Sequence, residues 1–169
     1  MTILETERLV LREIEEDDAE FVLDLLNQPS FIKYIGDRGV RSVEQSREFI
    51  ESRYRKSYSD HGYGLYAVML RADNVPIGMC GFVRRDSLPG PDIGFAFLPQ
   101  HERQGYGYES ASAVMNYGRD VLGFTNVLAI TSQDNDASGR LLEKIGLRFD
   151  RLIEMPPDSE VLKLFSAEF

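Results

Sequence analysis

The chain has 169 residues, 43% of them hydrophobic and 28% charged, which is the composition of an ordinary globular domain. Its formal net charge is −9, so a nucleic-acid backbone would be repelled and nucleic acid is not an expected partner. A single cysteine excludes an intramolecular disulfide and a thiolate metal cluster, and we expect no metal.

The amino-terminal stretch MTILETERLVLREIEEDD lacks the basic flank and long apolar run of a signal peptide. No other apolar run approaches the ~20 residues that span a bilayer. We therefore expect a cytoplasmic protein without a membrane partner. No repeat, linker or low-complexity segment interrupts the chain, so residues 1–169 are expected to form one domain, as a monomer or a homodimer.

The first half of the chain predicts one strand and two helices. Residues 8–14 are rich in strand formers. Asp17 and Glu20 have the spacing of a capping box and predict the start of a helix that Pro29 ends. Ser42 and Gln45 repeat this spacing and predict a second helix that continues through Tyr58.

From residue 63 the hydrophobic period changes. The runs YGLYAVMLR, VPIGMCGFVRR and PDIGFAFLP are separated by turn-like segments and predict an antiparallel meander. Ala111, Val114 and Met115 recur at helical spacing, and a strand (TNVLAIT), a helix (137–145) and two closing strands follow. The order β-α-α-β-β-β-α-β-α-β-β predicts an α+β or mixed α/β fold.

The segment HERQGYGYES lies between a predicted strand and a predicted helix, where glycine is a poor helix former. A helix amino end presents unpaired N–H groups and partial positive charge, and Gly105 and Gly107 would let backbone approach an anion such as pyrophosphate. Neither the P-loop pattern nor the dinucleotide fingerprint is present. The alternative is that both glycines only shape a turn.

A second informative segment, SQDNDASGRLLEKIGLRF, covers a strand end and the following helix. Asn135 and Ser138 stand three positions apart at the start of that helix, so both can face the same space. Taken alone, the segment favours the simpler interpretation of Asn135 as an N-cap.

Together with TERLVLR at the front and IGFAFLP before the glycine loop, these segments resemble GNAT-superfamily N-acetyltransferases of the RimJ/RimL type over essentially the whole chain. The resemblance implies a central, mostly antiparallel twisted sheet of about seven strands with four helices, and acetyl-CoA as co-substrate. It implies that main chain at Phe97 and Leu98 pairs with the pantetheine arm, with Asn135 on the arm's other side. The residues implied to hold the pyrophosphate are Arg103, Gln104, Gly105, Tyr106, Gly107 and Tyr108.

The sequence departs from the family pattern at two positions. Glu102 occupies a slot that is often Gln or Arg, and Arg103 follows it. Leu142 occupies the position at which many members carry a tyrosine that protonates the departing thiolate. RimJ/RimL-type relatives also lack that tyrosine, and there the Ser138 position is the suggested donor.

Direct acyl transfer needs a neutral amine, donors for the developing oxyanion and routes for protons. The N–H near Leu98 would polarise the thioester carbonyl. Asp92 is the candidate general base and would act through water. The alternative is that Asp92 is only a turn residue after PGP. Cys80 lies in the apolar run IGMCGF and is expected to be buried and inert rather than an acyl carrier.

The predicted function is therefore acetyl-CoA-dependent transfer of an acetyl group to a primary amine. The acceptor could be a protein amino terminus, an amino acid, a polyamine or another small amine. Two alternatives remain. One is a non-catalytic acyl-CoA-binding sensor, suggested by Glu102 and Leu142, and the other is an interaction module whose glycine loop binds nothing.

Overall fold

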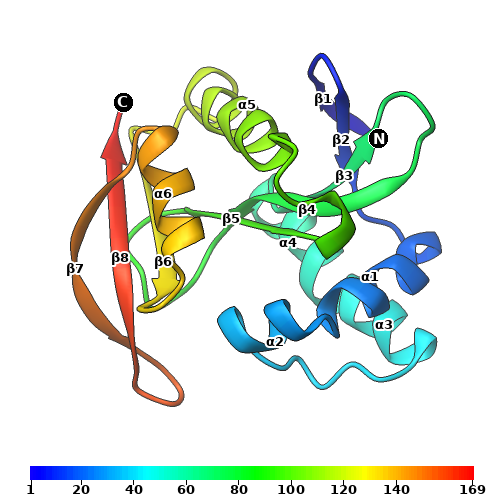
Figure 1. Cartoon of the computed structure of the whole chain (residues 1–169), viewed down its shortest axis with the longest axis horizontal. Coiled ribbons are helices and arrows are strands. Elements are labelled where there is room, and N and C mark those ends of the chain that lie inside the picture. Colours follow the sequence, from blue (N-terminus) through cyan, green and yellow to red (C-terminus); the bar gives the residue numbers. More distant parts are fainter.

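The computed structural model describes the whole chain, residues 1–169, and contains one eight-stranded sheet in the order β1-β2-β3-β4-β5-β6-β8-β7 (Figure 1). The strands are β1 (Thr2–Glu5), β2 (Leu9–Glu13), β3 (Leu65–Leu70), β4 (Pro76–Val83), β5 (Asp92–Phe97), β6 (Asn126–Ser132), β7 (Arg148–Met155) and β8 (Glu160–Glu168).

Helices fill the connections between these strands. The α-helices are α1 (Ala19–Leu26), α2 (Pro29–Tyr34), α3 (Val43–Phe49), α4 (Lys56–His61), α5 (Tyr106–Asp120) and α6 (Asp136–Lys144). The 3₁₀-helices are η1 (Glu16–Asp18) and η3 (Pro99–His101), and the π-helix η2 (Ile50–Arg55) joins α3 to α4. None of the helices is both long and apolar enough to cross a membrane.

Every strand pair is antiparallel except β5 and β6, which are parallel. These two strands share a single register pair, Asp92 with Leu128, and the Leu128 N–H donates to the carbonyl of Pro91 at 2.9 Å. Beyond that point β5 pairs only with β4, and β6 only with β8. The sheet is therefore split along β5 from just after Asp92 onward, toward the end of the strand that leads into α5.

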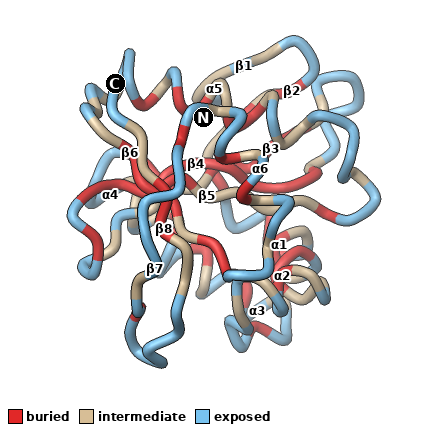
Figure 2. The backbone as a smooth tube through the Cα atoms, turned by 60° about the vertical axis from the view of Figure 1, so that its left-hand side comes forward, coloured by how far each residue is buried: buried red, intermediate tan, exposed pale blue.

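The two faces of the sheet bury separate cores. Ala111 and Val114 of α5 and Leu142 of α6 pack on one face. The other face is covered by α1–α3 and η2, with Val22 and Ile50 among its buried residues. Figure 1 shows α5 and α1–α3 on opposite sides of β3–β5, and Figure 2 shows that β7 and its turn are the most exposed part of the sheet. The split between β5 and β6 thus lies between two well-packed layers.

The predicted elements are confirmed with three corrections at the amino-terminal end. The sheet has eight strands rather than about seven, because residues 2–5 form a strand of their own beside β2. The first helical segment begins with η1, whose capping box joins Glu15 and Asp18 rather than Asp17 and Glu20. Pro29 does not end the helical region but starts α2, because its fixed φ suits the first position of a helix.

The second helix begins as predicted, with the Ser42 hydroxyl accepting the Gln45 N–H at 3.1 Å. It runs unbroken through α3, η2 and α4 to Gly62, whose left-handed φ of 78° ends it. A π-helical turn in the middle of a helix was not predicted, since it leaves no signature in the hydrophobic spacing.

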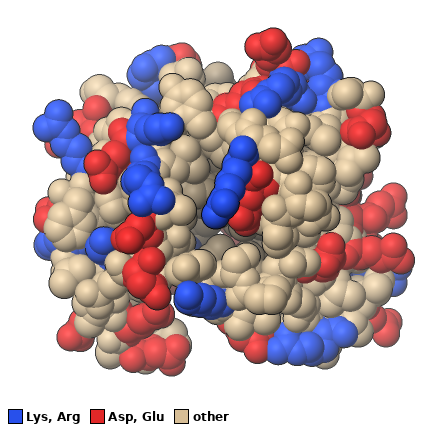
Figure 3. All heavy atoms as spheres, in the orientation of Figure 1, with Lys and Arg blue, Asp and Glu red and all other residues tan.

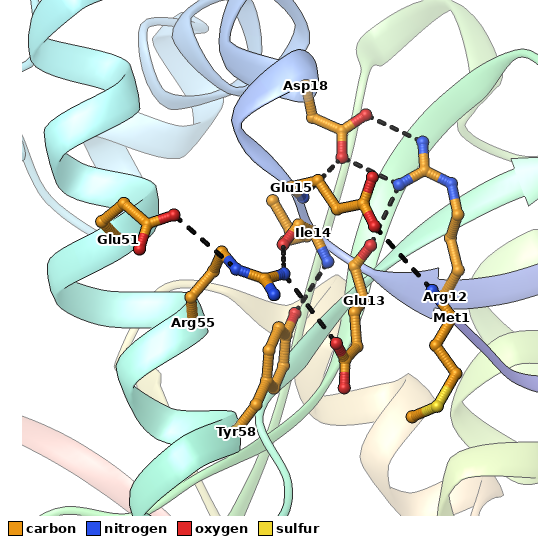
Figure 4. Close-up of polar contacts among 9 residues, drawn as sticks. All are labelled: Met1, Arg12, Glu13, Ile14, Glu15, Asp18, Glu51, Arg55 and Tyr58. Carbon is orange, nitrogen blue, oxygen red and sulfur yellow. Dashed lines mark hydrogen bonds and ion pairs between the residues drawn. The ribbon is translucent and has the colours of Figure 1, made fainter.

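A polar network fastens this helical layer to β2 (Figure 4). The Arg12 guanidinium donates to both carboxylate oxygens of Asp18 at 2.8 Å, and Asp18 also accepts the Glu15 N–H. Arg55 of η2 donates to the Ile14 carbonyl at 3.0 Å, and the Tyr58 hydroxyl accepts the Ile14 N–H at 2.9 Å. The network holds η1 and η2 to the same end of β2.

Candidate active site

The glycine-containing loop after β5 has the backbone of an anion-binding turn. Arg103 and Gly105 both adopt left-handed conformations, with φ of 61° and 83°, and Gln104 lies between them. None of these three residues donates its N–H to another part of the chain. Alternating conformations of this kind direct successive N–H groups into one concavity. Gly105 is also the N-cap of α5, so these donors lie at the positive end of a 15-residue helix.

The side chains of the loop mostly lie outside this concavity. Glu102, Arg103 and Gln104 are exposed, and the Gln104 amide donates to the Gln100 carbonyl at 3.2 Å. Tyr108 is half exposed on the first turn of α5. The loop therefore offers an anion its backbone rather than its carboxylate, and the departure at Glu102 leaves the N–H groups of residues 103–105 free.

Gly107 has a different reason to be glycine from the one the sequence suggested. A Cβ at Gly107 would lie 3.1 Å from Leu141 Cδ2 of α6 and 3.7 Å from the Phe97 ring. The missing side chain therefore permits close packing of α5 on α6. The positive φ at position 105 favours glycine. Of the two glycines, it is therefore Gly105 whose conformation lets the backbone present its N–H groups to an anion.

The open edge of β5 is formed by the main chain of Phe97 and not by the N–H of Leu98. The Leu98 N–H donates to the Ile77 carbonyl of β4 at 2.9 Å, so it is not free to polarise a carbonyl, contrary to our expectation. Along an antiparallel pair, successive residues direct their main-chain groups to opposite edges. The N–H and carbonyl of Phe97 therefore face the side from which β6 diverges.

Across the split, β6 carries a polar group that sequence reasoning missed. Thr131 is 8% exposed and its hydroxyl is the one buried side-chain polar atom without a hydrogen-bond partner. Ala129, two positions earlier, belongs to the core beneath α5 and α6, so Thr131 points to the same face. Buried hydroxyls almost always have partners. An unpaired one beside the diverging strands fits a bound molecule that carries amide groups.

Asn135 and Ser138 lie together at the start of α6, as predicted. The Asn135 carboxamide oxygen accepts the Ser138 N–H at 3.3 Å, which is the N-cap contact of the simpler interpretation. Ser138 is half-buried and its hydroxyl makes no hydrogen bond within the chain. Leu142 is buried in the core, so that position offers neither a proton nor access to a ligand.

Asp92 lies at the closed end of the split and on the opposite face from Phe97. Ile93 and Phe95 pack toward α5, and the alternation along β5 directs Asp92 and Ala96 to the face covered by α1–α3. Burial raises the pKa of Asp92 to about 6, although Arg85, whose Nε lies 3.1 Å from the carboxylate, lowers it in part. A carboxylate with this pKa changes protonation close to neutral pH.

Two further arginines lie close to this second face, and neither makes an ion pair. Partial desolvation lowers the pKa of Arg38, and the positive charges of Arg85 and Arg53 lower it further. Arg53 lies over the Phe49 ring, and the neighbouring Tyr54 hydroxyl contacts Met79 Sδ of β4 at 3.7 Å. In a chain of net charge −9, two arginines without an ion pair thus lie close to this face.

Cys80 is fully buried in the first core, and burial raises the pKa of its thiol to about 12. It is therefore inert, as expected, because the thiolate is the reactive form. No group of three or more metal-binding side chains is present in the structure.

The space-filling view shows the shape and the charged side chains of one face of the molecule (Figure 3). The face seen in Figure 1 is hollowed near its centre, between the half that contains β6–β8 with α6 and the half that contains β1–β4 with the remaining helices. Basic and acidic side chains border the hollow. The split in the sheet thus opens to solvent.

Comparison with known proteins places this geometry in a family. Residues 8–148 match the family model described as Acetyltransferase (GNAT) domain. The uncharacterized N-acetyltransferase YoaA of Bacillus subtilis is 32% identical over 147 residues, which are 86% of this chain and 82% of the relative.

Solved structures agree with the family match. A GNAT-family acetyltransferase from Bacillus anthracis superposes with a TM-score of 0.80 at 26% identity, covering 99% of this chain and 98% of that one. RimL, a ribosomal L7/L12 alpha-N-protein acetyltransferase in complex with coenzyme A, has the same fold, with a TM-score of 0.82 at 15% identity over 100% of this chain and 98% of RimL. The family model covers most of the chain, and the protein is a member of the GNAT acetyltransferase family.

Proposed function

We propose that the protein transfers an acetyl group from acetyl-CoA directly to a primary amine. The observation that carries this proposal is the junction of β5 with α5, where residues 103–105 present unused N–H groups at a helix amino end beside the split in the sheet. The coenzyme A complex of RimL, which shares the fold, supports the choice of cofactor.

The residues on the α5 face have polar groups that match those of acetyl-CoA. Main-chain N–H groups from Arg103 to Tyr108 would hold the pyrophosphate. The main chain of Phe97 on one side and the unpaired Thr131 hydroxyl on the other would receive the amides of the pantetheine arm. Asn135 would keep its role as N-cap and extend the same polar edge. The cofactor supplies the activated acetyl thioester.

Ser138 is the residue we assign to the departing sulfur. Its hydroxyl is free of other hydrogen bonds, and it lies one turn into α6, whose amino end faces the split. A hydroxyl that donates to sulfur as negative charge develops would stabilise the transition state more than the ground state. With a leucine at position 142, no other side chain of this motif can donate.

Asp92 is the residue we assign to the proton that leaves the amine. It lies on the face opposite to the α5 core, and we take the acceptor to approach from that side. With its pKa raised to about 6, it is ionised at neutral pH and still basic enough to accept a proton through water. An α-amino group, with a pKa of about 7.7–8.0, needs less help from a base than a lysine at about 10.4.

The charge near the acceptor face favours an amine that also carries a negative group. Arg38 and Arg53 have no carboxylate partner in the chain, whereas the charge of Arg85 is offset by Asp92. A polyamine would meet repulsion there, whereas an amino acid or an acidic protein amino terminus would be attracted.

The test is a turnover screen over amine classes with detection of the free thiol of CoA. A thermal-shift titration with CoA should accompany it, because a ligand that binds only the native state raises the melting temperature. Turnover with at least one amine supports the proposal. A melting-temperature shift without turnover would favour the non-catalytic acyl-CoA sensor, and the absence of both would leave the glycine loop without a ligand.

A further inference from the structure

A charged network joins the turn between β1 and β2 to the first turn of α5. Arg8 Nε lies 2.6 Å from Glu109 Oε1, and the Arg8 N–H donates to Glu109 Oε2 at 2.9 Å. The Thr6 hydroxyl donates to the same oxygen at 2.5 Å. Residues about 100 positions apart in sequence are thus tied together by three contacts to one carboxylate.

The carboxylate at the centre of this network is ionised. Burial raises the pKa of Glu109, but hydrogen bonds from Thr6 and from Arg8 lower it by more, so that the net pKa lies below the ordinary value. A full negative charge therefore lies in the first turn of α5, next to the N–H groups proposed for the pyrophosphate. Without a counter-charge it would repel a phosphate.

Arg8 supplies that counter-charge and also contacts the loop itself. Its Nη1 donates to the Gln104 carbonyl at 2.9 Å, and its guanidinium stacks on the Tyr106 ring at 4.5 Å. Its Nη2 lies 3.2 Å from the position that a Cβ on Gly105 would occupy, and this nitrogen has no acceptor in the chain. One guanidinium therefore touches residues on both sides of Gly105.

We infer that Arg8 is a positioning residue for the phosphate-binding loop. It holds residues 104–106 in the conformation that leaves their N–H groups free, and it offsets the charge of Glu109 at the helix end. The inference rests on the proposed function, because it takes the loop to be the site of the CoA phosphates. Arg103, which lies in the loop itself, is exposed and makes no ion pair, so it does not offset the charge of Glu109.

The test compares ligands with and without phosphates. Calorimetric titration of Arg8→Gln with CoA should give a Kd about tenfold or more above wild type, the size of one lost charged contact. The Kd for pantetheine, which lacks the phosphates, should stay within about twofold of wild type, whatever its starting value. Arg119→Gln is the control, since Arg119 is about as exposed as Arg8 and forms an ion pair with Asp120 at 2.8 Å at the carboxyl end of α5, away from the loop.

A double variant separates the two parts of the role. Arg8→Gln combined with Glu109→Gln removes both charges, and CoA affinity should recover in part because the uncompensated carboxylate is gone. No recovery would overturn the charge-offset part. If Arg8→Gln does not fold, Arg8→Lys can replace it, because lysine keeps the charge but cannot make the paired contacts. Arg8→Lys should lose less affinity for CoA than expected for Arg8→Gln, and its affinity for pantetheine should not change.

The outcomes also distinguish this inference from the proposed function. Wild-type protein that binds no CoA would overturn the proposed function, and this inference with it. Wild-type binding that Arg8→Gln leaves unchanged, or an equal loss for CoA and pantetheine, would overturn only the positioning role of Arg8.

Discussion

At the scale of single residues, the proposed chemistry depends on two side chains that lie on opposite faces of one sheet. Ser138 lies at the start of α6 with a free hydroxyl, and Asp92 lies buried at the closed end of the split. Sequence reasoning selected both positions. The structure adds the pKa of Asp92 and its ion pair with Arg85, neither of which could be read from the chain.

Replacing Ser138 with alanine should lower kcat by about tenfold to a hundredfold, the effect of losing one hydrogen bond to developing charge. CoA affinity should change little, because the Ser138 hydroxyl is assigned to the sulfur only as charge builds on it. The alanine variant keeps the Asn135 cap, since that contact uses the Ser138 N–H. Steady-state kinetics of Ser138→Ala with a good amine substrate would test this role. A kcat equal to that of the wild type would rule out Ser138 as the donor.

The pH dependence of the reaction should show the titration of Asp92. Its pKa is raised to about 6, so the base is protonated below that pH and kcat/KM should fall as the pH drops from about 7 to 5. Asp92→Asn should be slower at neutral pH and should lack this acidic limb. Rates measured from pH 5 to 8 for both proteins test this, and an identical acidic limb in Asp92→Asn would assign it to another group.

At the scale of elements, the packing of α5 on α6 explains a glycine that the sequence assigned to phosphate. Because a Cβ at Gly107 would lie 3.1 Å from Leu141 Cδ2, Gly107→Val should overpack the helix pair and destabilise the ligand-free protein by about 1–3 kcal/mol. Gly107→Ala should be much milder. Urea unfolding without ligand is the measurement. An unchanged unfolding free energy for Gly107→Val would restore the original explanation, in which the side chain only obstructs the anion.

The attachment of η1 to β2 is a second element-scale feature with a measurable energy. Burial raises the pKa of Asp18, but Arg12 and the Glu15 N–H lower it by more, so its contribution to stability is present above the ordinary pKa near 3.9 and is lost as the pH falls through the lower folded value. Asp18→Asn should lower the free energy of unfolding at pH 7 by about 3 kcal/mol, because Arg12 loses its partner.

Denaturant unfolding at pH 7 and near pH 3 tests this expectation, since the difference between wild type and Asp18→Asn should shrink at the lower pH. Asp37→Asn is a suitable control, because its ion pair with Arg41 is exposed and should contribute little to stability. An equal decrease in the free energy of unfolding in Asp18→Asn and Asp37→Asn would contradict the stabilising role given to the Arg12–Asp18 pair.

At the scale of the whole molecule, the distribution of charge predicts which amines are accepted. The chain is acidic overall, yet Arg38 and Arg53 place two unpaired positive charges near the proposed acceptor face. Among peptides that differ only at the second residue, those with an acidic side chain should be acetylated with a kcat/KM about tenfold above those with a basic one.

The same preference should weaken with added salt and in the double variant Arg38→Gln/Arg53→Gln. A competition assay with both peptides in one reaction gives the ratio of their kcat/KM values directly. A preference for the basic peptide, or for polyamines, would contradict the assignment of an anionic acceptor.

Most of the fold was predictable because its elements depend on residues that are close in sequence. Three short apolar runs separated by turn-like segments predicted β3–β5, and the caps at Ser42 and Asn135 formed where their spacing indicated. The short strand β1 was missed because residues 2–5 have a partner only after the chain turns back on itself. Pro29 was misjudged because proline can end one helix or begin the next, and neighbouring residues do not distinguish the two.

The sequence by itself determined the family pattern, the junction of a strand with the loop and α5, and the presence of Asn135 and Ser138 at one helix start. Hydrogen bonds and periodicity over a few residues specify such features. Only the tertiary structure decided that Gly107 faces Leu141, that the Leu98 N–H is already donated, that Thr131 lacks a partner and that Arg8 meets Glu109. These contacts join segments far apart in the chain, and they exist only once the two layers have closed on the split sheet.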